Sequence, residues 1–191
     1  MQRKTLDRLL AAVGLAVAVV LLAAGGLLAW AHNYVHGQVR DQLSAQQIYF
    51  PAKGSAALAS NEIGPYLDKY AGQQLLTGDQ AKAWADHYIA VHVREMTGGK
   101  TYAQLSSQAQ ANPGDTKLAA EVETVFKGET LRGLLLNAYA FDTMGNLALI
   151  GSIVSFAGAG VLAILAVLGL GHARRVNRSA VPPTPAELEK V

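Results

Sequence analysis

Two stretches without a charged side chain decide the fold: LLAAVGLAVAVVLLAAGGLLAWA at residues 9–31, and TMGNLALIGSIVSFAGAGVLAILAVLGLG at residues 143–171. A helix needs about 20 mostly apolar residues to cross the roughly 30 Å hydrocarbon core of a bilayer. Both stretches are long enough. We therefore expect two transmembrane helices, at 9–31 and 143–171, which form a hairpin in the lipid bilayer.

The segment 32–142 between the two spans is a little over one hundred residues long. That is about the size at which a soluble domain can bury a usable core. Its apolar residues recur at helical spacing, and no pair of segments shows the alternation that is typical of strands. The sequence therefore predicts an all-α fold: a two-span transmembrane helical hairpin with a small extracytoplasmic helical domain between the spans.

The charges at the two ends of the chain set the expected orientation. The tails 1–8 and 172–191 each carry a net charge of +2, whereas 32–142 carries nine Lys and Arg against eleven Asp and Glu. Lys and Arg in short flanks of a span stay in the cytoplasm. We therefore expect a multi-pass protein of the cell membrane with both termini cytoplasmic. The expected interface anchors are Trp30, Tyr34, Arg174 and Arg175.

The first apolar run resembles an uncleaved signal anchor. Ala29-Trp30-Ala31 has the small-x-small pattern of a signal-peptide cleavage site, but the run is longer than the usual apolar region of about 7–15 residues. We expect an anchor. Cleavage would instead leave a single-span protein whose body is still outside the cell.

Composition excludes several classes of function. The absence of cysteine excludes a disulfide framework, a thiolate metal site and a cysteine nucleophile. Neither span holds an ionisable group at mid-depth, which argues against an ion pathway or proton relay. Because the basic tails are short and lie beside the spans, no nucleic-acid partner is expected.

The second span has small residues at every fourth position: Gly151, Ser155, Ala159 and Ala163. On a helix they form one stripe at which another helix can approach closely. The stripe predicts packing of the two spans against each other or against a partner.

Local patterns place the helices of the central domain. No breaker follows the first span, so its helix is expected to continue to about Gln47. Thr77 and Gln80 form a capping-box pattern, which opens a helix that runs to about Met96. We expect Ala81, Trp84, Tyr88, Val91 and His92 to lie largely on one face of this helix.

Three further signals complete the domain. Thr97-Gly98-Gly99 is expected to stop that helix, and a short polar helix should follow at 102–110. Asp115 or Thr116 is expected to cap a last helix, which runs without a proline into the second span. Gly128 and Gly133 are possible bends in it.

Gly99-Lys100-Thr101 resembles the end of a phosphate-binding loop. The full pattern needs a glycine where Arg94 stands, and a preceding buried strand. A helix precedes it here, so these glycines are expected to form a C-cap. Neither a nucleotide nor any other cofactor is expected.

His32 and His36 are four residues apart, so on a helix both rings can face one side and could hold one metal ion. No third ligand follows from the sequence: Asp41, or Asp86 with His87, would have to fold over. The pair can equally be two amphipathic residues at the level of the lipid headgroups. Asp142, just outside the second span, is expected to pair with Arg40 or Arg132, or to mark the water boundary.

The block IAVHVREMTGGKTYAQL at 89–105, with TGGKTYA at 97–103 and more loosely 132–138, resembles an uncharacterised family of small actinobacterial two-span membrane proteins. Some members are labelled aromatic ring-opening dioxygenases. That chemistry needs an iron site of histidine and carboxylate, and the sequence shows no such constellation. The resemblance implies an envelope protein of a Gram-positive cell and nothing catalytic. The polar insertion at 106–114 is longer than the family implies.

Two functions from different classes remain. The first is a non-enzymatic envelope protein, a structural or accessory subunit that acts through helix packing and its outer domain. Its partner would be another membrane protein or a second copy of the chain. The alternative is a ligand- or metal-handling membrane protein with a site near the outer membrane surface, built from His32, His36 and the aromatic pair Tyr49-Phe50.

Overall fold

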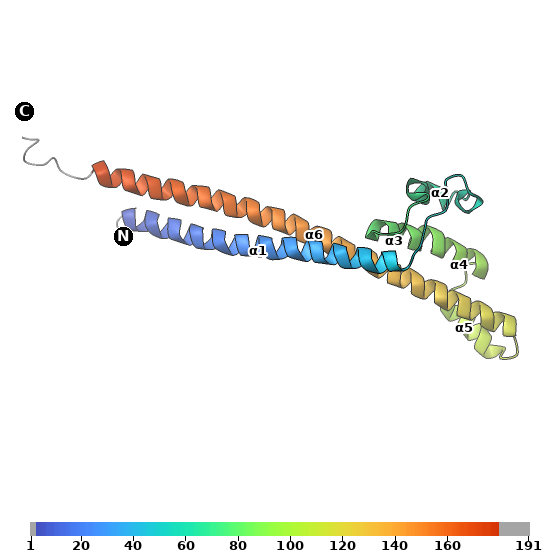
Figure 1. The fold of residues 1–191 in the computed structure, drawn as a ribbon. Helices are drawn as coiled ribbons and strands as arrows, with labels where there is room; N and C mark the ends of the chain where they lie inside the picture. Colours follow the sequence, from blue (N-terminus) through green and yellow to red (C-terminus); the bar gives the residue numbers. More distant parts are fainter. Residues whose placement is uncertain (1–2, 180–191) are drawn as a thin grey trace, which may run out of the picture. The chain divides into compact units, whose positions relative to one another are not determined.

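The computed structural model describes residues 3–179, and within that range the fold is all-helical, as predicted (Figure 1). The single bridge between extended segments there is antiparallel and joins Tyr49 to Gln74. The elements in chain order are α1 (Arg3–Ala45), the 3₁₀ turn η1 (Ala56–Leu58), α2 (Gly64–Leu67), the 3₁₀ turn η2 (Asp68–Tyr70), α3 (Gly78–Trp84), the π-helical turn η3 (Ala85–Ile89), α4 (Ala90–Thr97), α5 (Tyr102–Ala111) and α6 (Thr116–Ser179).

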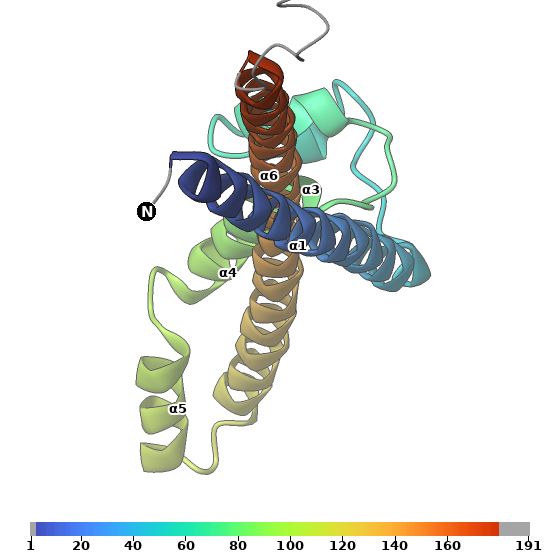
Figure 2. The same ribbon diagram turned by 90° about the vertical axis from the view of Figure 1, so that its left-hand side faces the viewer.

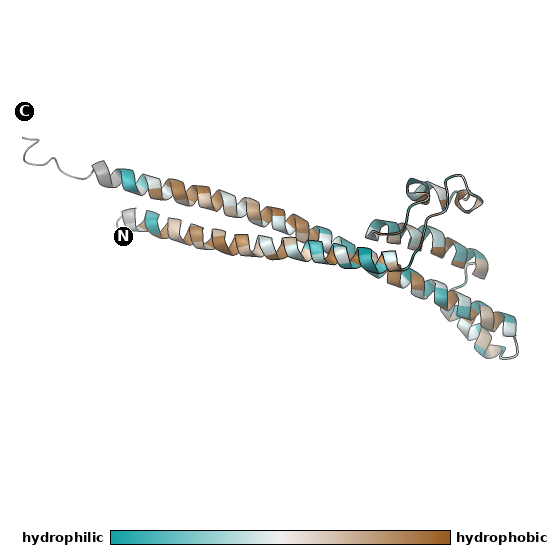
Figure 3. Cartoon of the chain, viewed as in Figure 1, coloured by the Kyte–Doolittle hydropathy of each residue, from teal (hydrophilic) through white to brown (hydrophobic). Residues whose placement is uncertain are grey.

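The two charge-free runs lie in the two long helices. α1 has 43 residues and α6 has 64, and their most apolar windows both reach a mean hydropathy of 2.5 (Figure 3). Both helices are long and apolar enough to cross a membrane. The continuation of α1 beyond the first run is confirmed, and so is the uninterrupted course of α6. α6 continues through Gly128 and Gly133, the two positions named as possible bends.

The contacts divide the chain into two compact units. One comprises the chain up to Ala31 together with the chain from Ala148, and the other is His32–Leu147. We call them the apolar unit and the domain unit. The first division falls where the sequence predicts the end of the first span. The second falls five residues inside the predicted second span.

Within the apolar unit, α1 and α6 run antiparallel and in contact. A Cβ built on Gly151 would lie 3.1 Å from Leu28 Cδ1, and one on Gly158 would lie 3.3 Å from Leu21 Cδ1. The Ser152 hydroxyl donates to the carbonyl oxygen of Gly25 over 2.8 Å and is buried. Such hydrogen bonds between helices contribute on average about 0.6 kcal/mol in a membrane protein.

The small-residue stripe of α6 lies on the side that contacts α1. Ala159 is 1% exposed, Ser155 and Ala163 are half-buried, and Gly151 touches Leu28. Gly160 has open space around its Cα. Because the stripe is covered within the chain, the faces of α1 and α6 that stay exposed carry large side chains such as Leu22 and Val154, which are 51% and 65% exposed.

Several segments of the domain unit contribute residues to its core. Leu67, Leu75, Leu105 and Val125 are fully buried. They come from α2, from the segment before α3, from α5 and from α6 respectively. An extended strap at 48–51 closes this core, because Phe50 N–H donates to the Gln73 carbonyl over 2.8 Å and Leu75 N–H donates to the Ile48 carbonyl over 2.9 Å.

The predicted helix at 77–96 is present, but a turn of different pitch in its middle changes which positions face the core. Thr77 is its N-cap, and both hydrogen bonds of the predicted capping box with Gln80 are present. A π-helical turn, η3, lies in its middle. One row of buried positions therefore recurs every four residues rather than every 3.6, because a π turn inserts an extra residue. These positions are Ala81, Ala85, Ile89, Val93 and Thr97.

The residues of the predicted face differ in their exposure. Ala81 and Val91 are buried, and Trp84 and Tyr88 are half-buried. His92 shares this face with them but is exposed, and its Nδ1 lies 2.7 Å from the Tyr88 carbonyl oxygen. The Trp84 ring makes an edge contact with Phe50 at 5.1 Å.

The connection from α4 to α5 follows the prediction. Gly98 ends α4 in the left-handed conformation at φ 59°, and Gly99 follows at φ 84°. Thr101 then caps α5 in a second capping box, with Gln104. The glycines of the TGGKTYA block therefore make a helix-to-helix turn. A left-handed φ costs glycine little because it has no Cβ.

α5 lies alongside the first turns of α6 (Figure 2), and the Tyr102 and Phe126 rings are 5.7 Å apart. Asp115 caps α6, as its Oδ1 accepts from the N–H groups of Lys117 and Leu118. Gly128 is a point of close approach: a Cβ there would lie 2.9 Å from Val93 Cγ2.

Candidate functional site

Two regions of the domain unit are candidates for a functional site. The first is a polar junction at which α1, α3 and α6 meet. It comprises His32 and His36 from α1, Asp142 and Gly145 from α6, and Gly78 at the start of α3. The second is an apolar groove between α1 and α6, described below.

An aspartate and a histidine pair at the centre of the junction. His36 Nδ1 lies 2.9 Å from Asp142 Oδ1, and Asp142 is 8% exposed. The expectation that Asp142 pairs with Arg40 or Arg132 is wrong. Arg132 instead contacts Glu129 at 3.2 Å and Asp86 at 3.5 Å. The antiparallel packing of α1 on α6 brings His36, and not Arg40, opposite Asp142.

Both histidines predicted as metal-ligand candidates turn their Nδ1 atoms toward α6. His32 Nδ1 donates to the carbonyl oxygen of Gly145 over 2.9 Å. The two imidazole rings meet at 61° with centroids 4.4 Å apart. His36 Nε2 is buried without a hydrogen-bond partner. Among residues 3–179, no three histidine, cysteine or acidic side chains are grouped to hold a metal ion.

This geometry favours a structural role for the junction, in which it holds α1 against α6. A general base needs its free nitrogen within hydrogen-bond reach of a substrate, and the free nitrogen of His36 faces α6: it would lie 3.0 Å from a Cβ at Gly145. The polar contacts of the two histidines hold α1 to α6. Buried polar pairs of this kind fix one register between two helices.

The junction depends on Gly78, the first residue of α3. A Cβ at Gly78 would lie 2.4 Å from Asp142 Cβ and 2.8 Å from its carboxylate Oδ2. The first residue of α3 therefore approaches α6 as closely as a backbone without a side chain allows. Gly78 lies inside the capping box of Thr77 and Gln80, and its close approach to α6 is visible only in three dimensions.

A charged cluster lies on the neighbouring faces of α3, η3 and α6. Lys82 Nζ lies 2.5 Å from Asp86 Oδ2, and Arg132 contacts the other oxygen of Asp86. Burial by itself would raise the pKa of the Asp86 carboxyl, but the hydrogen bond and charge of Lys82 and the charge of Arg132 hold it below 3.8. The hydrogen bond to Asp86 raises the pKa of Lys82.

This cluster predicts a loss of stability in acid. A carboxyl whose pKa is lowered by folding stabilises the folded state above its unfolded pKa, and this contribution disappears as the pH falls through the folded pKa. We expect the free energy of unfolding of the parent chain to fall more steeply below about pH 4 than that of an Asp86→Asn variant. Denaturant titrations of both proteins between about pH 6 and pH 2 measure this. Parallel profiles would contradict it.

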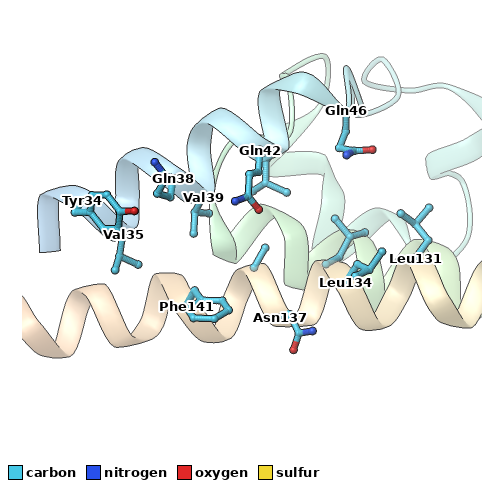
Figure 4. Close-up of a pocket in the computed structure, with 13 residues that line it drawn as sticks. Tyr34, Val35, Gln38, Val39, Gln42, Gln46, Leu131, Leu134, Asn137 and Phe141 are labelled. Atoms are coloured by element: carbon cyan, nitrogen blue, oxygen red, sulfur yellow. The ribbon is translucent and has the colours of Figure 1, made fainter. Parts of the chain in front are cut away.

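The groove between α1 and α6 has a volume of about 510 Å³ (Figure 4). Tyr34 and Phe141 lie at one end of it, and Gln46 and Leu131 at the other. The residues that line it are Tyr34, Val35, Gln38, Val39, Gln42, Leu43 and Gln46 of α1, with Leu131, Leu134, Leu135, Asn137, Ala138 and Phe141 of α6. None of these side chains is charged.

The predicted interface anchors are all on helix surfaces. Trp30 and Tyr34 are 64% and 54% exposed, and Arg174 and Arg175 are exposed near the end of α6. Of the two predicted basic tails, residues 1–2 and 180–191 lie outside the described residues. The aromatic pair of the alternative function is split: Tyr49 is 59% exposed, whereas Phe50 is 3% exposed and belongs to the core.

Sequence reasoning missed the groove and the pairing of His36 with Asp142. Setting the two apolar runs against each other as an antiparallel hairpin brings together the segments that hold His36 and Asp142. It does not fix which residues of the two segments face each other. Comparison of the chain with protein-family models, with curated proteins and with solved structures found no match.

Proposed function

We propose that this chain is a two-span integral membrane protein of the cell envelope that acts as a non-enzymatic structural or accessory subunit. Its helical domain would lie outside the membrane and both termini would be cytoplasmic. The relationship to the actinobacterial two-span family is part of the same proposal. The observation that carries it is the pair of apolar helices α1 and α6, whose most apolar windows are only 17% and 11% buried.

Apolar side chains exposed to this extent on α1 and α6 need an apolar environment. Leaving a Leu or Val side chain in water rather than burying it costs about 1.5–3 kcal/mol. The large side chains that α1 and α6 turn away from each other include Leu22, Leu27, Val154 and Val167, each more than half exposed. Lipid or a partner helix satisfies such surfaces. The charges that flank the spans support the cytoplasmic placement of both ends.

The topology is tested by cysteine labelling, which suits a chain without native cysteine. We expect Ser107→Cys in α5 to react with a membrane-impermeant maleimide on intact cells, and His172→Cys to react only after permeabilisation. Leu22→Cys, in the middle of the first span, serves as the control and should stay unlabelled until the protein is denatured. Labelling of His172→Cys in intact cells would contradict the proposed orientation. A mature chain that begins near residue 32 would instead show a cleaved signal peptide.

The accessory role is tested by crosslinking in native membranes. The Lys127 side chain in α6 is 70% exposed and offers an amine for a short crosslinker. We expect a defined membrane-protein partner or a second copy of the chain at this site, identified by mass spectrometry of the linked peptides. The same reaction after dispersal in detergent controls for chance collisions. A chain that stays monomeric and unlinked in its own membranes would contradict the role.

The alternative is a ligand-handling membrane protein, and the groove is the observation that favours it. The groove belongs to the domain unit, and its lining is mainly apolar and carries no charge. A pocket of about 300–1,000 Å³ with a mainly apolar lining is typical of small-ligand sites. His32 and His36 would support such a site by holding its two walls together.

A further inference from the structure

We propose that the groove between α1 and α6 binds one acyl chain of a membrane phospholipid. The proposal names a ligand for the outer domain and rests on the proposed placement of the chain in a membrane. It is carried by the dimensions of the groove, by the chemistry of its walls and by its position along the two helices.

The dimensions of the groove fit a thin, extended ligand. The lining of α1 runs from Tyr34 to Gln46, thirteen residues, which is a length of roughly 18 Å at a rise of about 1.5 Å per residue. A volume of about 510 Å³ spread over that length describes a long, narrow groove that is open along one side.

A single hydrocarbon chain matches these dimensions. A lipid chain spans half of the bilayer core, roughly 15 Å. Because carbon atoms pack at about 3.5–4.0 Å, such a chain is only about 4–5 Å wide. An α-helix with its side chains is about 10–12 Å wide. A helix of a partner or of a second copy could therefore lie over the groove but could not enter it.

The walls suit an occupant without charge. The buried side of the groove is formed by Val39, Leu43 and Leu135, which are 6%, 4% and 3% exposed. The polar groups in the lining are the neutral amides of three glutamines and one asparagine and the phenol of Tyr34. A charged ligand would lose its hydration here without gaining a partner of opposite charge. An alkyl chain has no such cost.

The open rim of the groove still exposes apolar surface. Leu134, Phe141 and Tyr34 are 61%, 57% and 54% exposed (Figure 4). An acyl chain lying along this rim would cover all three. Scattered exposed apolar residues are normal on a protein surface, but these three line one groove, so a single ligand in the groove could cover them.

The position of the groove gives a lipid chain access. Tyr34 follows the first charge-free run by three residues, and Phe141 precedes the second by two. Both distances are less than one helical turn. The end of the groove marked by these two aromatic rings therefore lies at the proposed membrane interface, where Tyr side chains are enriched.

The test uses the full chain in phosphatidylcholine vesicles that contain a phosphatidylcholine with a photoactivatable diazirine on one acyl chain. After irradiation, mass spectrometry maps the labelled residues. We expect labels in the groove segments 34–46 and 131–141, in addition to labels on the two spans. Label on the spans without label in the groove would overturn this proposal alone. No label on either span would overturn the proposed membrane placement as well.

Two matched substitutions on α6 locate the ligand. Ala138→Phe fills the groove, whereas Ala140→Phe places the same ring two residues away, at an exposed position that does not line it. We expect groove labelling to fall roughly fivefold or more in Ala138→Phe and to stay at the parent level in Ala140→Phe. Span labelling should be unchanged in both. Equal groove labelling in the parent and in Ala138→Phe would overturn the proposal.

A second variant, Leu134→Glu, tests the proposal even if Ala138→Phe does not fold. Leu134→Glu puts a charge on the groove rim at a position that is 61% exposed, so the fold should tolerate it. Groove labelling is again expected to fall, because a carboxylate beside the chain would have to be desolvated. Unchanged labelling in this variant, or a crosslink from the groove to a second polypeptide in place of lipid, would overturn the proposal.

Discussion

Replacing Gly78 by alanine should destabilise the outer domain by about 2–4 kcal/mol. The added Cβ would lie 2.4 Å from the Cβ of Asp142. That atom is attached directly to the backbone of α6 and cannot swing aside as the end of a long side chain can. Either α3 or α6 must shift, and the shift also strains the contact between Asp142 and His36.

The measurement is urea unfolding of the full chain in a mild detergent, followed by tryptophan fluorescence. The chain has two tryptophans, and a Trp30→Phe background leaves Trp84, in the domain core beside Phe50, as the single reporter. Gly133→Ala is the matched control. It lies in α6 with nothing within 4 Å of its would-be Cβ, and alanine is favoured over glycine in a helix by about 0.5–1 kcal/mol. Equal effects of the two substitutions would refute the close approach at Gly78.

Leu75→Ala should cost about 2–5 kcal/mol of domain stability. The Leu75 side chain is 0% exposed, and its backbone N–H donates to the Ile48 carbonyl, which ties the strap at 48–51 to the segment before α3. Truncation removes apolar contacts and leaves a cavity that the surrounding helices fill only in part. The strap hydrogen bond survives because the backbone is unchanged, so the loss reports on packing.

Leu134→Ala is the control for this truncation. The side chain is 61% exposed, so the same change should shift the unfolding free energy by less than about 0.5 kcal/mol. The same fluorescence assay compares the two. If Leu75→Ala were as stable as Leu134→Ala, the core around Leu75 would not be the one described.

The ends of the helices could be read from the sequence because the interactions that set them are local. Thr77 with Gln80, and Thr101 with Gln104, each lie within four residues, and both capping boxes form. The turn at Gly98 and Gly99 depends on the backbone freedom of two adjacent residues. The π turn η3 was not predicted. It changes the repeat of one row of buried residues from 3.6 to 4. His92, which ordinary helical spacing groups with Ala81 and Trp84, is therefore exposed while those two are buried or half-buried.

The candidate site could be read only in part. His32 and His36 were recognised as a pair on one side of α1, because the spacing i, i+4 defines a helix face. The groups that these rings contact, the Gly145 carbonyl and the Asp142 carboxylate, lie more than one hundred residues away along the chain. The groove walls come from the same two distant segments, and its volume depends on how far apart the helices lie.

The sequence by itself determined the two apolar helices, the all-helical class and the caps and turns of the domain, since each depends on residues within a few positions of one another. Only the tertiary structure decided which residue of α1 faces which residue of α6. It thereby decided the pairing of His36 with Asp142, the close approach at Gly78 and the groove lined by Tyr34 and Phe141. The physical reason is that helix register and side-chain packing are set by contacts between distant segments, and no local propensity encodes them.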